Sequence, residues 1–178
     1  RPVVASADDF TVRGGAADAA LHRKFIQCEA MAHEYRLPLI RMIDGTGGGG
    51  SVKTLEDMGY TYISHVPGWD QIIANLDTVP VVALALGPTA GLGAARVVAS
   101  HYSIMVRGLS QLFAAGPAVA AAIGDTLDGE ELGGVDVHTR NGVVEDEVAS
   151  EAEAFARARW FLSYLPSSIH ERAMRTPC

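Results

Sequence analysis

The sequence predicts an α/β fold in which a parallel sheet is covered by helices. Short apolar runs of strand length alternate with longer stretches of helical period. The run at 80–86, "PVVALAL", contains no polar residue, which is typical of a strand buried on both faces. The chain has 178 residues, of which 48% are hydrophobic, and this is enough for one domain with a single core.

The expected elements alternate along the chain. In order, they are a strand at 2–6, a helix capped by Asp18 and ending before Pro38, a strand at 38–43, a helix at 68–79, a strand at 80–86, a small-residue helix at 94–102, strands at 103–107 and 111–115, and a helix at 116–124. Two more helices are expected to begin with capping boxes, at Asp128 with Glu131 and at Ser150 with Glu153. The last helix is expected to stop at Pro166.

Composition excludes several classes of function. A net charge of −7 argues against a nucleic-acid partner, and no apolar run approaches the roughly 18 residues of a membrane span. The two cysteines, Cys28 and Cys178, are too few for a disulfide framework or a zinc site and fit a reducing, cytoplasmic location. The histidines lack partners at metal-ligand spacing, so we expect no metal in this chain.

Two glycine-rich segments follow predicted strands. "GTGGGG" follows the strand at 38–43, and "GPTAGLG" follows the strand at 80–86. In parallel sheets, ligands bind where strands reach their carboxyl ends. Glycine lets a ligand approach backbone N–H groups, and the N–H groups of Gly91 and Leu92 would lie at the start of a helix. One donor from each segment would form an oxyanion hole for an enolate or a tetrahedral intermediate.

Each segment alone has a simpler interpretation. A glycine run is often just a turn, and "GPTAGLG" also fits close packing of a helix on a strand. A phosphate cradle is the third alternative, but the sequence contains neither GxxxxGK[ST] nor a GxGxxG directly between strand and helix. The two segments together favour the oxyanion hole.

A further set of motifs gives the chain a family resemblance. In order, they are "DDFTVRGG", "DGTGGGG", "LGPTAGLGAARVV", "QLFAAGP", "GEELGGVDVHTRNGV" and "FLSYLPSS". The chain resembles, over nearly its whole length, the amino-terminal half of the carboxyltransferase (beta) subunit of biotin-dependent acyl-CoA carboxylases of the propionyl-CoA and methylcrotonyl-CoA type. That family belongs to the crotonase superfamily, so the resemblance implies a spiral of ββα units.

The resemblance implies transfer of a carboxyl group from carboxybiotin to the α-carbon, or the vinylogous carbon, of an acyl-CoA. The amino-terminal domain then holds the acyl-CoA, and a second carboxyltransferase domain meets biotin across a subunit interface. The implied partners are a biotin carboxylase, a biotin carrier and further copies of the chain. On this basis residues 1–178 are expected to be one domain of a longer protein and inactive when isolated.

The resemblance also assigns site residues. Those implied as oxyanion donors are Gly47, Gly48, Gly91 and Leu92. Those expected along coenzyme A are Arg13, Gly14, Gly15, Gly87 and Ala90. His138 matches the family pattern and is expected at a strand end, where it hydrogen-bonds the structure rather than reacting.

Other functions remain open at this stage. Crotonase-type hydratases carry a glutamate in the helix after the second glycine segment, whereas here that helix reads "GAARVVASHY". The missing carboxylate favours transfer over hydration. A biotin-dependent decarboxylase, such as the glutaconyl-CoA type, and a catalytically silent binding or assembly module are the alternatives.

Overall fold

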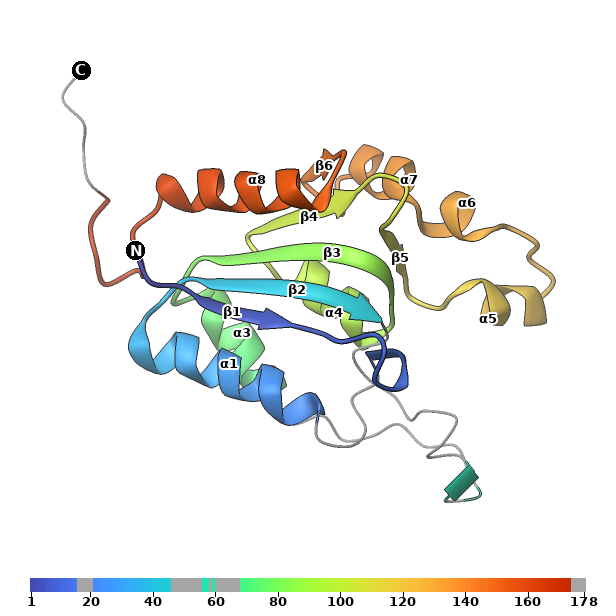
Figure 1. Cartoon of the computed structure of the whole chain (residues 1–178), viewed down its shortest axis with the longest axis horizontal. Helices are drawn as coiled ribbons and strands as arrows, with labels where there is room; N and C mark the ends of the chain where they lie inside the picture. The colour runs from blue at the N-terminus through green and yellow to red at the C-terminus, as the bar shows by residue number, and fades with distance from the viewer. Residues whose placement is uncertain (16–20, 46–55, 58, 60–67, 174–178) are drawn as a thin grey trace.

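The computed structural model describes residues 1–15, 21–45, 56–57, 59 and 68–173, and it shows one sheet with helices on both faces (Figure 1). Below the sheet in this view lie α1 (Leu21–Tyr35) and α3 (Trp69–Leu76), and α4 (Leu92–Val98), which contacts β2 and β3, is seen behind the strands. Above it lies α8 (Glu151–Ser163), which packs on the strands of the other half of the sheet. This two-sided cover explains why the central strand is apolar throughout.

Every strand pairing in the described chain is parallel. The strands are β1 (Val4–Ala7), β2 (Leu39–Gly45), β3 (Val81–Ala90), β4 (Tyr102–Val106), β5 (Gln111–Phe113) and β6 (Asp146–Val148). The order is β1-β2-β3-β4-β6, and β5 pairs with the far end of β3. The predicted parallel sheet is therefore confirmed, and its carboxyl edge brings together the ends of β1, β2 and β3.

Strand β3 is longer than the sequence predicts. The strand was expected at 80–86, but it continues to Ala90 because Pro88–Ala90 pair with β5 and Gly45 of β2 pairs with Thr89. The second glycine segment is therefore strand through Ala90, and the turn is confined to Gly91. Helix α4 begins directly after it, two residues earlier than expected.

Short helices gather beyond the carboxyl ends of the strands. They are η1 (Arg13–Gly15), α5 (Pro117–Ala122), α6 (Gly129–Gly133) and α7 (Val135–Arg140). The expectation that His138 lies at a strand end is wrong, because α6 leads directly into α7 and His138 is helical.

One predicted capping box is complete and the other is not. Asp128 and Glu131 exchange both hydrogen bonds at the start of α6. At the start of α8 the Ser150 hydroxyl accepts from the N–H of Glu153 at 3.2 Å. The Glu153 carboxylate, however, accepts from Ala149, one residue before the cap. The second box is therefore only half formed, although α8 still begins where the sequence places it.

A buried ion pair joins the sheet to the helices beneath it. The Arg41 side chain of β2 is fully buried, and its Nε donates to Glu29 Oε1 of α1 at 2.6 Å. Asn75 of α3 donates to the same carboxylate at 2.7 Å. Burial lowers the pKa of Arg41, and the bond to Glu29 opposes that effect. Breaking such a pair from one side costs about 3–5 kcal/mol, because a buried charge is left alone.

No helix in the described part of the chain is long and apolar enough to cross a membrane.

Candidate site at the carboxyl ends of the strands

Glycines in η1 and at the end of β2 allow backbone to pack directly on backbone. A Cβ on Gly15 would overlap the carbonyl oxygen of Asp44, and a Cβ on Gly45 would overlap that of Gly14. Gly14 and Gly15 also have positive φ angles of 64° and 69°, a region that favours glycine. The turn after β1 therefore sits directly against the end of β2.

Gly87 plays a comparable part on β3. A Cβ at this position would overlap the Asp44 carboxylate, so the Asp44 side chain lies against the bare backbone of the neighbouring strand. From the sequence, a ligand was expected to lie close to the backbone at Gly15 and Gly87. In the structure it is Asp44 of the same chain that lies close to both glycines. Their contact with coenzyme A, like that of Gly14 and Ala90, stays a prediction. Arg13 begins η1, close to the same junction.

The Gly91 turn holds the two donors predicted from this segment, and the structure treats them differently. Gly91 has φ 57° and ψ −120°, a conformation that side chains rarely permit. Its N–H donates to the carbonyl of Phe113 at 3.0 Å, so this group is already used within the fold. The N–H of Leu92, at the first helical position of α4, has no acceptor within its own helix. Of the two donors predicted here, Leu92 is the one with no backbone acceptor among the described residues, and its role stays a prediction.

The first glycine segment lies outside this description. Gly47 and Gly48, the other predicted donors, fall outside the described residues, so their role stays a prediction.

Asp44 is a site feature that the sequence analysis missed. Its Oδ1 is buried and finds no hydrogen-bond partner in the described chain. Burial raises the pKa of Asp44, and the negative charges of Asp8 and Glu151 raise it further. Asp8 itself forms an ion pair with Arg96, whose Nη1 lies 3.0 Å from Asp8 Oδ2. The only sequence signal was position, because Asp44 directly follows the strand and precedes the glycines.

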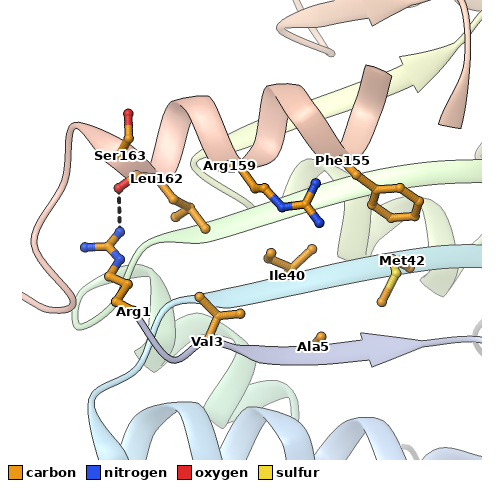
Figure 2. A pocket seen from close by; sticks show the side chains of 9 residues that line it. All are labelled: Arg1, Val3, Ala5, Ile40, Met42, Phe155, Arg159, Leu162 and Ser163. Atoms are coloured by element: carbon orange, nitrogen blue, oxygen red, sulfur yellow. Dashed lines mark hydrogen bonds between the residues drawn. The ribbon is translucent and has the colours of Figure 1, made fainter. Parts of the chain in front are cut away.

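A groove of about 740 Å³ lies away from these residues, between α8 and the open face of β1 and β2 (Figure 2). Val3, Ala5, Ile40 and Met42 form its floor, and the side chains of α8 that line it are Phe155, Arg159, Leu162 and Ser163. At its amino-terminal end, Arg1 donates a hydrogen bond to the Leu162 carbonyl. None of the predicted site residues that the structure describes lines this groove.

Metal binding finds no support in the described residues. Within 1–15, 21–45 and 68–173, and at the few described residues between them, no group of three or more His, Cys, Asp or Glu side chains is placed to hold a metal ion.

Comparison with known proteins identifies the family of the chain. Residues 1–178 match the family described as the carboxyl transferase domain, and the chain belongs to that family. This confirms the resemblance drawn from the motifs.

Individual relatives are carboxylase and decarboxylase subunits. The chain is 31% identical to the mitochondrial methylcrotonoyl-CoA carboxylase beta chain of Dictyostelium discoideum, covering 89% of this chain and 27% of that one. It is 29% identical to the human mitochondrial propionyl-CoA carboxylase beta chain, covering 100% and 32%. It is also 29% identical to the methylmalonyl-CoA decarboxylase alpha subunit of Veillonella parvula, covering 97% and 33%. The chain thus spans about a third of the length of these relatives.

Solved structures confirm the crotonase-like α/β fold. Transcarboxylase 12S, solved with hydrolysed methylmalonyl-coenzyme A bound, superposes with a TM-score of 0.76 at 25% identity, covering 96% of this chain and 33% of that one. The beta subunit of Pseudomonas aeruginosa geranyl-CoA carboxylase gives 0.73 at 24% identity, covering 91% and 30%, and supports the fold alone.

Replacing Gly15 by alanine should destabilise the protein more than replacing Gly14. Both positions have positive φ, so each substitution should cost about 1–2 kcal/mol for the left-handed backbone. Only Gly15 faces a backbone carbonyl, whereas nothing lies within 4 Å of a Cβ on Gly14. The overlap should add about 1–3 kcal/mol to Gly15→Ala. Urea unfolding of both variants measures the difference, and equal losses would show that the junction is not tightly packed.

Replacing Asp44 by asparagine should stabilise the protein at neutral pH. A carboxyl whose folded pKa is raised favours folding when protonated, so its contribution falls as the pH rises above 3.8, its ordinary value. The gain in urea midpoint should be largest near pH 7 and should shrink as the pH falls towards that value.

Asp9→Asn is the matched control, with the opposite sign. Hydrogen bonds from the Thr11 hydroxyl and N–H lower the pKa of Asp9. Its contribution to stability is therefore present above its ordinary pKa and lost as the pH falls. A loss of stability in Asp44→Asn that is the same at all pH values would contradict the electrostatic account of Asp44.

Proposed function

We propose that this chain is the acyl-CoA-binding part of a carboxyltransferase. The enzyme would move a carboxyl group from carboxybiotin to the α-carbon, or the vinylogous carbon, of an acyl-CoA. Membership of the carboxyl transferase family and the names of the relatives support this reaction class. The observation that carries the proposal is the Gly91–Leu92 turn, where the Leu92 N–H has no backbone acceptor within the described part of the chain and lies where parallel sheets bind ligands.

The chain's part in the reaction is to stabilise negative charge. When the α-carbon loses its proton, the charge moves to the thioester oxygen, and the Leu92 N–H donates a hydrogen bond to that oxygen. A preorganised donor of this kind is worth about 10²–10³ in rate. Carboxybiotin supplies the carboxyl group and the base when it is bound.

The same proposal sets the partners. Carboxybiotin would arrive on a partner carrier charged by a biotin carboxylase, and a second carboxyltransferase domain would complete the site in a homo-oligomer. Transcarboxylase 12S is described as a hexamer assembly, which supports an oligomer here. The net charge of −7 and the two cysteines support a cytoplasmic enzyme with no nucleic-acid partner.

A biotin-dependent decarboxylase is the second candidate. The chain is as similar to a methylmalonyl-CoA decarboxylase subunit as it is to the human propionyl-CoA carboxylase beta chain, and this similarity favours a decarboxylase. Both reactions pass through the same enolate, so the Leu92 donor serves either. Assaying the assembled complex for ATP-dependent carboxylation and for release of carbon dioxide from the carboxylated product separates the two directions.

Substitution of Leu92 tests the site. Leu92→Ala keeps the backbone N–H and should change kcat little, whereas Leu92→Pro removes the donor and should lower kcat by about 10²–10³. Proline is well tolerated at the first helical position, so the fold should survive the change. Incorporation of labelled bicarbonate into propionyl-CoA or methylcrotonyl-CoA by the full complex is the measurement. Equal losses in two correctly folded variants would mean that the Leu92 side chain, not its N–H, matters.

A further inference from the structure

We infer that His138 is a positioning residue for the Gly91–Leu92 turn, acting through strand β5. This inference rests on the proposed function, because it concerns the same backbone donor. It assigns a physical role to a histidine that lies outside the reacting groups. The role follows from three contacts that connect α7 to the turn.

The first contact holds the turn itself. Gly91 adopts a backbone conformation with positive φ, and such a conformation persists only where its surroundings hold it. Its N–H is fixed on the Phe113 carbonyl at 3.0 Å, and its own carbonyl accepts from Ala95 at 3.0 Å to begin α4. The direction of the next N–H, that of Leu92, therefore depends on where Phe113 lies.

The second contact supports β5, which is only three residues long. Its pairing with β3 joins Pro88 to Gln111 and Ala90 to Phe113 along one edge. Helix α6 also packs against β5. Its last residue, Gly133, lies so close to the strand that a Cβ there would overlap the Leu112 carbonyl and the Phe113 ring. A strand this short has few hydrogen bonds of its own, so its position depends on these neighbours.

The third contact is the histidine. His138 Nε2 lies 2.7 Å from the Leu112 carbonyl oxygen. A carbonyl can only accept, so Nε2 carries the proton and donates. His138 Nδ1 is buried and has no hydrogen-bond partner in the described chain. The hydrogen bond to Leu112 of β5 is therefore the one that holds the His138 ring within the described chain. Leu112 is the residue directly before Phe113.

The experiment compares three substitutions of His138 in the full carboxyltransferase complex. His138→Leu removes the donor, His138→Asn keeps a polar group too short to reach Leu112, and His138→Gln keeps a donor near the position of Nε2. We expect the leucine and asparagine variants to lose about 10- to 100-fold in kcat with little change in KM for the acyl-CoA, as for a misplaced donor. Glutamine should restore most of the loss.

His101 provides a matched control. Its Nε2 also bonds to a backbone carbonyl, that of Leu76 at 2.9 Å, and its Nδ1 accepts from the N–H of Val81 at 3.0 Å. It lies at the amino end of β3, opposite the Gly91 turn. His101→Leu therefore removes comparable bonds without touching β5, and kcat per folded protein should be unchanged. An equal loss of kcat in His101→Leu would reduce the His138 effect to general destabilisation and overturn the inference.

Amide hydrogen exchange separates this inference from the proposed function. His138→Leu and His138→Asn should speed exchange of the Gly91 N–H, whereas His138→Gln and His101→Leu should not. This readout needs no turnover, so it tests the contact even if the wild-type complex transfers no carboxyl group, which would refute the proposed function alone. Unchanged Gly91 exchange in a folded His138→Asn variant would overturn the inference. Faster exchange with unchanged kcat would also overturn it, by showing a structural bond that does not position the donor.

Discussion

The site depends on close backbone packing at the carboxyl edge of the sheet. The turn η1, the end of β2 and the backbone of β3 meet around Asp44, and at Gly15, Gly45 and Gly87 no room remains for a side-chain carbon. This packing fixes the turn after β1 against β2 and sets the end of β2 against β3. Because β3 then continues to the Gly91 turn, the position of the Leu92 N–H, the proposed donor, follows from the same constraint.

The two halves of the chain contribute differently to this edge. The first half supplies the strands and a buried pair, Arg41 with Glu29, that ties β2 to α1. The second half holds the turn from outside, because β5 accepts the Gly91 N–H and α6 and α7 hold β5. Asp44 lies at the junction, and its Oδ1 has no hydrogen-bond partner among the residues that the structure describes. An unpaired carboxyl with a raised pKa lowers stability at neutral pH, and such groups cluster at functional sites.

Much of the fold follows from the sequence, while the contacts of the site do not. Alternating periodicity and fully apolar strands predict the parallel sheet, since both depend on local pattern. The pattern fails from Pro88 to Ala90, which locally indicate a turn but are held as strand by pairing with β5. It also fails at His138, where α6 continues into another helix. A glycine-rich pattern predicts that something lies close to the backbone. The pattern is the same whether that neighbour is a ligand or another segment of the chain. The partner of the Gly91 N–H, Phe113, is a long-range contact that no spacing reveals.

The central claim is that Leu92, and not Gly91, donates to the substrate from this turn. A structure of the full-length complex with an acyl-CoA bound tests it most directly. The account predicts the thioester oxygen within about 2.7–3.2 Å of the Leu92 nitrogen, the ordinary range for such a bond, with the Gly91 N–H still on the Phe113 carbonyl. A thioester oxygen held by the Gly91 N–H, turned away from Phe113, or bound away from this turn altogether, would contradict it.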